Sequence, residues 1–219
     1  MACVYGSFLS LLLGTLGVLL SLVAVAMPAW STSINTLPKP AFSAGLWGLC
    51  FHGSNDTLNN CFGYYHANDY GQQGMNAQGV CDMYKSSSKL HTLAVIEKED
   101  FNAFMDQACG KTGKAALVIA SISTMTGAFA SFCMLFAISI CSKIGVKLVG
   151  ISQVIYAMGA ALSFIVVVLW VYIASGLNHD GISFGASFIL ENFTMILFAV
   201  ASGTLFISQR KRSFEELPK

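Results

Sequence analysis

Four long stretches of apolar and small residues predict four membrane-spanning helices. Val4 to Met27, Ala115 to Ile140 and Leu148 to Leu177 contain no charged residue, and Ile182 to Ser208 contains only Glu191. About 20 apolar residues in a helix cross the hydrocarbon core of a bilayer. None of the stretches alternates between apolar and polar residues as a barrel strand does. The pattern favours spans at about 4–27, 115–140, 148–177 and 182–208 over buried helices of a soluble protein.

The first stretch has a second interpretation, as a cleaved signal peptide. Ala24-Val25-Ala26 resembles the small-residue cleavage site of such a peptide. No basic residue precedes the stretch, however, and it is longer than the apolar region of a signal peptide, which has about 7–15 residues. We therefore expect a first span that stays in the protein.

The basic residues of the short connections predict the orientation. Short loops rich in Lys and Arg stay on the cytoplasmic side, and the connection 176–185 carries only Asp180. We expect a single domain of residues 1–219 at the plasma membrane, with 31–113 and 176–185 as extracellular loops and 209–219 as a cytoplasmic tail, so that both termini are cytoplasmic. The cytoplasmic basic residues are Lys143, Lys147, Arg210, Lys211 and Arg212.

The overall composition agrees with a membrane protein. Hydrophobic residues make up 55% and charged residues 11%, whereas a soluble domain is about 25% charged. Such a high apolar content excludes a disordered chain. A net charge of +1 gives no electrostatic footprint for nucleic acid.

The long loop carries four of the seven cysteines, namely Cys50, Cys61, Cys81 and Cys109. An even set of cysteines in a short extracellular module indicates disulfides. Four cysteines allow three pairings, and pairing in sequence order closes two local loops. A metal site is the rival interpretation, but the loop has no CxxC pair and its histidines lack finger spacing.

The rest of this loop predicts small elements and one modification. The region of 90–108 has apolar residues at helical spacing and predicts one amphipathic helix, although Glu97 and Lys98 interrupt the apolar stripe. Asn55 opens an Asn-Asp-Thr sequon and is a candidate for glycosylation. Aromatic residues between Gly and Asn predict short strands and turns: Trp47, Phe51, Phe62, Tyr64, Tyr65 and Tyr70.

One set of residues resembles a known superfamily. Trp30 follows the first span, and Gly45-Leu46-Trp47 is followed by Cys50 and, after ten residues, by Cys61. This is similar to the W…GLW…C…C signature of claudins and peripheral myelin proteins, whose superfamily includes calcium-channel gamma subunits and AMPA-receptor regulatory subunits. The resemblance implies an all-α transmembrane four-helix bundle with a small extracellular antiparallel β-sheet. It also implies Cys50–Cys61 and Cys81–Cys109 disulfides and a structural role for Trp30, Gly45, Leu46 and Trp47 near the membrane.

Three candidate functions follow from the resemblance. The first is assembly with copies of itself in one membrane at cell junctions, giving adhesion or a paracellular barrier. Two features weaken this first function: the chain lacks the apolar last residue of a PDZ-binding terminus, and its loop 176–181 is short and polar. Two other segments, Ser187 to Glu191 and Val171 to Ser175, resemble the receptor-regulatory branch. The alternative is therefore an auxiliary subunit that modulates the gating or trafficking of an ion channel or receptor. A third candidate is a regulator of membrane organisation like the myelin proteins.

Several residues within or beside the spans are candidates for contacts. Glu191 either contacts a membrane-protein partner or bonds a Ser of a neighbouring span, such as Ser121, Ser123 or Ser163, and the second interpretation is favoured. Lys114 either reaches headgroups or an acidic partner or simply snorkels. Cys3 and Cys141, at the cytoplasmic membrane edges, are candidates for palmitoylation. Small residues at helix-packing spacing predict close contacts inside the bundle: Gly14 with Gly17, Gly127 with Ser131, and Ala157 with Ala161.

The sequence offers no arrangement for catalysis. Gly110-Lys111-Thr112-Gly113-Lys114 superficially resembles a phosphate loop but lacks the preceding glycine. No Ser/His/Asp set or HExxH segment is present. We expect a protein that is not an enzyme, that uses no cofactor, metal or small-molecule substrate, and whose partners are lipids and other membrane proteins.

Overall fold

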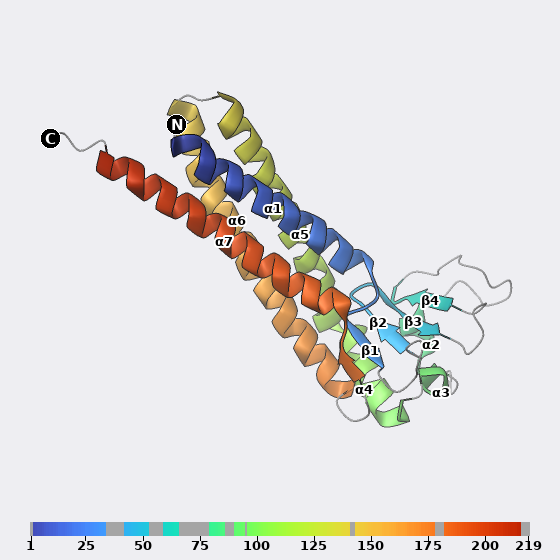
Figure 1. Ribbon diagram of the computed structural model, residues 1–219. Helices are drawn as coiled ribbons and strands as arrows, with labels where there is room; N and C mark the ends of the chain where they lie inside the picture. The colour runs from blue at the N-terminus through green and yellow to red at the C-terminus, as the bar shows by residue number, and fades with distance from the viewer. Residues whose placement is uncertain are drawn as a thin grey trace. The chain divides into compact units, whose positions relative to one another are not determined.

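The computed structural model describes residues 2–33, 42–52, 59–65, 79–85, 90–94, 96–140, 143–177 and 182–215. Four long helices dominate it: α1 (Ala2–Ala26), α5 (Lys111–Ile140), α6 (Lys143–Ala174) and α7 (Ala186–Glu215) (Figure 1). The predicted four long apolar helices are confirmed. Their segments long and apolar enough to cross a membrane are Gly6–Ala26, Lys111–Ile140, Gly145–Leu177 and Ala186–Arg210.

The chain forms two compact units. The helical unit takes residues 1–22, 119–165 and 190–219, and the sheet unit takes residues 23–118 and 166–189. The boundaries fall within the long helices, so each of these helices contributes residues to both units.

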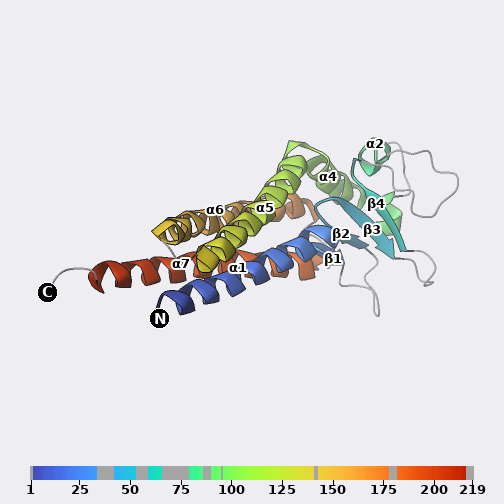
Figure 2. The same ribbon diagram turned by 90° about the horizontal axis from the view of Figure 1, so that it is seen from above.

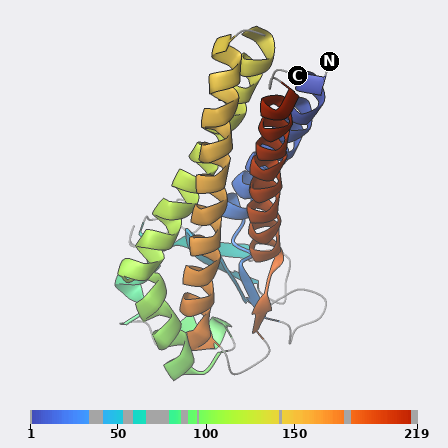
Figure 3. The ribbon, with the colours of Figure 1, turned by 90° about the vertical axis from the view of Figure 1, so that its left-hand side faces the viewer.

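In the helical unit, the segments of α1, α5, α6 and α7 run side by side (Figure 3). Its core contains Met134, Tyr156 and Phe198, all fully buried. Large apolar side chains also cover the outside of these helices, for example Met125 at 71% exposure. An apolar exterior is the expected surface of a helix in lipid.

The sheet unit is built on an antiparallel sheet with the strand order β4-β3-β2-β1-β5. Figure 2 shows β1 to β4 side by side. The predicted short strands around Phe51 and Phe62 are confirmed as β3 and β4, while Tyr70 lies outside the described residues. The strand bounds are β1 (Ser31–Ser33), β2 (Phe42–Ala44), β3 (Gly48–His52), β4 (Asn59–Gly63) and β5 (Ile182–Phe184).

The fourth long helix begins later than predicted. Residues 182–184 form β5, which pairs with β1 through Ser31 and Phe184, and α7 begins at Ala186. Gly185 lies between them, where an added Cβ would lie 2.3 Å from the carbonyl oxygen of Ala29. The close passage of the Ala29 backbone therefore requires glycine at the turn from strand to helix.

Short helices complete the sheet unit: α2 (Val80–Met83), α3 (Leu90–Ala94), α4 (Lys98–Ala108) and the 3-10 turn η1 (Ser175–Leu177). The prediction of one continuous helix over 90–108 is wrong. Glu97 has extended backbone angles and precedes the first turn of α4, which carries the acidic Glu99 and Asp100. Acidic residues favour the N-terminal end of a helix, and this charge run begins a second helix instead of continuing the first.

Candidate functional site

Trp30 is the centre of the sheet unit. Its side chain is fully buried, and its indole Nε1 donates a 2.7 Å hydrogen bond to the carbonyl oxygen of Ala24. The Trp30 ring lies 5.4 Å from that of Trp170 and 6.2 Å from that of Phe188. The Trp170 indole in turn donates to the hydroxyl of Ser31, next to Trp30. The structure therefore places Trp30 in a core position, as the resemblance implied.

The Gly45-Leu46-Trp47 segment packs against the end of α1. An added Cβ on Gly45 would lie 2.6 Å from the Cα of Pro28, so only glycine permits this approach. Leu46 is 2% exposed. The Trp47 indole donates a 2.8 Å hydrogen bond to the carbonyl oxygen of Ala26, while its ring is partly exposed. These residues hold the sheet to the last turn of α1.

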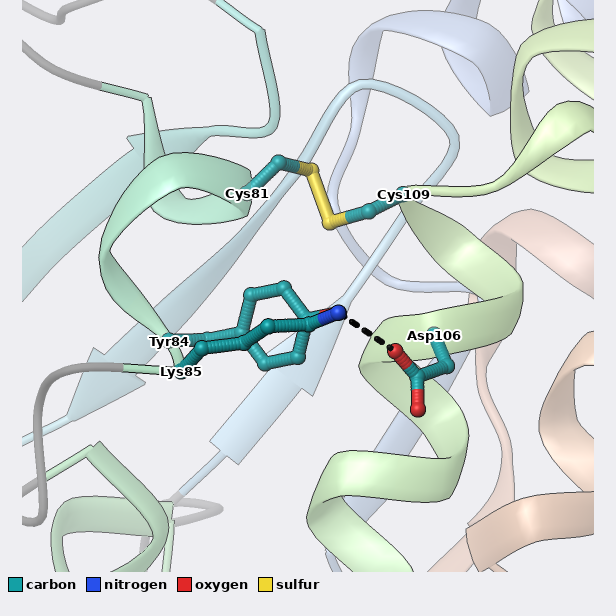
Figure 4. A network of polar contacts seen from close by, with 5 residues as sticks. All are labelled: Cys81, Tyr84, Lys85, Asp106 and Cys109. Atoms are coloured by element: carbon teal, nitrogen blue, oxygen red, sulfur yellow. Dashed lines mark hydrogen bonds and ion pairs between the residues drawn. A yellow bond between two sulfur atoms is a disulfide. The ribbon is translucent and has the colours of Figure 1, made fainter.

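The four loop cysteines form the two disulfides implied by the resemblance. Cys50 and Cys61 are direct partners on β3 and β4, with their Cα atoms 4.0 Å apart. Cys81 on α2 pairs with Cys109 after α4, with a Cα–Cα distance of 5.5 Å. The first disulfide links two strands of the sheet. The second, drawn in Figure 4, links α2 to the residue that follows α4.

A polar cluster that the sequence did not indicate lies beside the second disulfide. The Tyr84 hydroxyl donates to the carboxylate of Asp106, and the Lys85 ammonium lies 3.7 Å from the same carboxylate (Figure 4). Burial, followed by the hydrogen bond to Asp106 and its negative charge, raises the pKa of Tyr84 to about 12. Tyr84 and Asp106 are 22 residues apart, and no local pattern in the sequence indicates their contact.

Lys114 lies in the first turn of α5, and its side chain is exposed. Its ammonium lies 4.9 Å from the ring centroid of Tyr65, a cation–π distance. The Tyr65 hydroxyl donates a 2.9 Å hydrogen bond to the carbonyl oxygen of Ala108. Burial raises the pKa of Tyr65, so this phenol stays neutral beside the lysine. Lys114 thus has an aromatic contact within the sheet unit.

Glu191 is fully buried in the helical unit. It accepts a 2.7 Å hydrogen bond from Ser163, and its other oxygen lies 3.1 Å from the Ser21 hydroxyl. The favoured interpretation, a bond to Ser163 of a neighbouring span, is confirmed. Contact between Glu191 and a separate membrane protein stays a prediction; in the described chain its side chain has no exposed surface. No pattern in the sequence indicates the contact with Ser21, which is 170 residues away.

The predicted small-residue contacts hold in part. Added Cβ atoms on Gly17 and Gly127 would lie 2.8 Å and 2.2 Å from the Phe198 ring, and one on Gly14 would lie 2.1 Å from the Tyr156 hydroxyl. Ala157 and Ala161, by contrast, are exposed, so their predicted place inside the bundle is wrong. They lie on the face of α6 that turns away from the core.

The remaining candidate residues lie outside what the structure describes. Asn55, His66 and Cys141 are not among the described residues, and the side chains of Cys3 and His52 are not described either. Cys133 is a free, buried cysteine on α5.

The described residues offer little for ligand chemistry. They contain no group of three or more His, Cys, Asp or Glu side chains placed to hold a metal ion. A shallow, apolar groove of about 480 Å³ is lined by Lys147, Gly150, Ile151, Val154 and Ile155. Its one ionisable side chain, Lys147, is exposed, so the groove gathers no set of reactive groups.

The fold and the site together define a class of protein. Four apolar helices of spanning length and a disulfide-linked sheet unit indicate a multi-pass membrane protein. Comparison of the chain with protein-family models and with curated protein sequences found no match.

Proposed function

We propose that this chain is a non-enzymatic, claudin-like membrane protein that assembles with copies of itself within one plasma membrane and acts at cell contacts. In this proposal, the sheet unit lies outside the cell and both termini are cytoplasmic. The assembly limits passage along the paracellular path or supports adhesion. Membrane lipids and neighbouring copies of the chain are its partners.

One observation carries the proposal: each residue of the W…GLW…C…C pattern has a structural contact within the sheet unit. Trp30, Leu46 and Cys50 are each at most 2% exposed. Cys50 is cross-linked to Cys61 on the next strand. Such a pattern, spread over 32 residues, supports a constrained surface and not a reactive centre, because its members make packing contacts, backbone hydrogen bonds and a disulfide.

The second disulfide supports the outward placement of the sheet unit. Disulfides persist in oxidising compartments and are rare in the cytosol. A glycan on Asn55 tests this placement separately, because sequons are modified only on the luminal or extracellular side. A glycosidase-sensitive band that is absent from Asn55→Gln supports it, whereas protease mapping that places Cys81 on the cytosolic side would contradict it.

The decisive experiment is expression of the chain alone in cells that lack junctions. Continuous intramembrane strands in freeze-fracture replicas are the expected result. Cys133→Ala, which changes a free cysteine, serves as the control and should form the same strands, whereas Cys50→Ser should form none. Stoichiometric co-purification of an ion channel or receptor, without strands, would instead support the alternative function as an auxiliary subunit.

A further inference from the structure

The carboxyl group of Glu191 contacts hydroxyl groups from two other helices of the helical unit. Glu191 is the sixth residue of α7, one turn beyond the helix start. It is fully buried, and its contacts among the described residues are with Ser21 of α1 and Ser163 of α6. No lysine, arginine or histidine forms a salt bridge with it in the described part of the chain. An ionised carboxylate in this place would be a buried charge without a cation.

Two further hydroxyls extend the cluster into α5. Thr124 Oγ1 lies 2.7 Å from Ser21 Oγ and 3.0 Å from the carbonyl oxygen of Ala120. Ser123 Oγ lies 2.9 Å from Ser163 Oγ and 3.0 Å from the carbonyl oxygen of Gly159. The cluster therefore connects oxygen atoms of all four long helices.

The number of available hydrogens favours a protonated carboxyl group. The four hydroxyls and Glu191 make six oxygen–oxygen contacts of 2.7–3.1 Å. Each hydroxyl has one hydrogen to donate, so four hydrogens serve at most four contacts when Glu191 is ionised. Two close pairs of oxygens would then face each other with no hydrogen between them. The ionised carboxylate would also receive only two donors for its roughly four acceptor positions.

We propose that Glu191 binds a proton on Oε2 and donates it to Ser21, so that the site is a membrane-embedded proton site with a neutral carboxyl group. Ser21 then donates to Thr124, and Thr124 donates to the carbonyl oxygen of Ala120. Glu191 Oε1 is the carbonyl oxygen and accepts from Ser163. Five of the six contacts now contain a hydrogen.

The position of Glu191 on its helix is compatible with this neutral form. The partial positive charge of a helix N-terminus stabilises anions, but it falls off within the first turn. Glu191 lies about 8 Å along the axis from the start of α7, at 1.5 Å per residue. Isolated charges inside a membrane segment are also costly. The proposal concerns the helical unit and does not depend on the function proposed for the sheet unit.

Infrared spectroscopy of the full chain in detergent or lipid tests the proposal directly. The difference spectrum between the parent protein and Glu191→Gln at neutral pH should contain the C=O stretching band of a protonated carboxylic acid in the parent. Loss of a carboxylate band, with no such C=O band, would overturn the proposal. A carboxylate band without the C=O band in sodium or calcium chloride, but not in choline chloride, would assign a metal cation in place of the proton. This outcome would also overturn the proposal.

A second variant keeps the test valid if Glu191→Gln does not fold. Ser163→Ala removes the donor to Oε1, so the C=O band should shift to higher frequency. Ser152→Ala is the matched control, because Ser152 is also fully buried on α6 but bonds the carbonyl oxygen of Leu148 in its own helix. An unshifted band in Ser163→Ala, or an equal shift in both variants, contradicts the assignment.

Stability gives an independent readout. A glutamine accepts from Ser163 and donates to Ser21, as the protonated acid does, so Glu191→Gln should keep the parent Tm to within about 2 °C. Glu191→Ala removes both bonds and should lower Tm by more than about 4 °C. Equal losses in the two variants would mean that the negative charge itself is required, and would overturn the proposal.

Discussion

The helical unit and the sheet unit are held together by different interactions. Within the described residues, the sheet unit contains both disulfides, Cys50–Cys61 and Cys81–Cys109. The helical unit contains Cys133 as a free cysteine and no described disulfide. Its helices instead meet at glycine positions and through buried hydroxyls, as at Phe198 and Glu191.

This difference is what the proposed placement predicts, with the helical unit in lipid and the sheet unit in water. Lipid is as apolar as a leucine side chain, so burial in a membrane gives little hydrophobic driving force between helices. Close backbone approach and interhelical hydrogen bonds then stabilise the packing. A small sheet in water has a hydrophobic driving force but a small core, and cross-links raise its stability by restricting the unfolded chain.

The two units should be destabilised by different kinds of substitution. The sheet unit should depend on covalent links and on large aromatic side chains such as Trp30. The helical unit should depend on the absence of side-chain volume at a few positions. Substitutions of opposite kinds, one removing a bond and one adding a methyl group, should therefore damage the two units selectively.

The largest expected effect comes from breaking the strand-to-strand disulfide. Cys50→Ser or Cys61→Ser should lower the free energy of unfolding by about 2–5 kcal/mol and reduce delivery to the cell surface, because Cys50 is 1% exposed inside the sheet. Surface biotinylation and electrophoresis without reductant measure both consequences. Cys133→Ala should leave both unchanged. Normal delivery of Cys50→Ser with parental mobility would show that the sheet does not depend on this link.

The second effect concerns packing in the helical unit. A methyl group at Gly127 would lie 2.2 Å from the Phe198 ring. The ring has little room to move, because Cβ positions at Gly17 and Gly159 are also within 2.8 and 3.1 Å of it. Gly127→Ala should therefore lower the free energy of unfolding by about 1–3 kcal/mol.

Gly203→Ala is the matched control for this packing test. An added Cβ at Gly203 meets no atom within 4 Å, so this substitution should be neutral or stabilising by up to about 1 kcal/mol. Thermal unfolding of both variants in the same detergent gives the comparison. Equal Tm values for the two variants would show that the fit around Phe198 does not limit the stability of the unit.

The sequence was informative where one local property decides the structure. Runs without charge predict the four long helices, because length and apolar content alone determine whether a helix can span a bilayer. The cysteine pairing followed from the resemblance, since spacing left three pairings open. Contacts between Ser21 and Glu191 or between Trp30 and Trp170 join residues more than 100 positions apart. Such contacts depend on how the helices pack, and no local pattern in a single sequence predicts them.

The errors in the sequence prediction are also local and physical. Residues Ile182 to Phe184 are apolar and adjoin a span, so they were assigned to the helix although they form β5. Glu97 and Lys98 interrupt the apolar stripe, but this interruption alone does not distinguish the start of α4 from a polar position within one helix. Ala157 and Ala161 are exposed. Small residues at a spacing of four permit close helix packing but do not require it, so the spacing alone does not predict burial.

The smallest expected effect, and one that tests non-covalent bonding in the sheet unit, concerns Tyr84. Tyr84→Phe removes the hydrogen bond to Asp106 and should lower the free energy of unfolding by about 1 kcal/mol near neutral pH. Because the pKa of Tyr84 is raised from 10.0 to about 12 in the folded protein, the neutral phenol stabilises the fold fully below pH 10, and this contribution is lost as the pH rises from 10 to 12. The stabilities of the parent and of Tyr84→Phe should therefore converge over this range.

The difference in phenolate absorbance between the two proteins during an alkaline titration isolates Tyr84. Asp106→Asn, which keeps an acceptor oxygen but removes the charge, should shift the titration to lower pH. A stability difference that stays constant from pH 8 to pH 12 would show that the Tyr84 hydroxyl does not contribute through this bond.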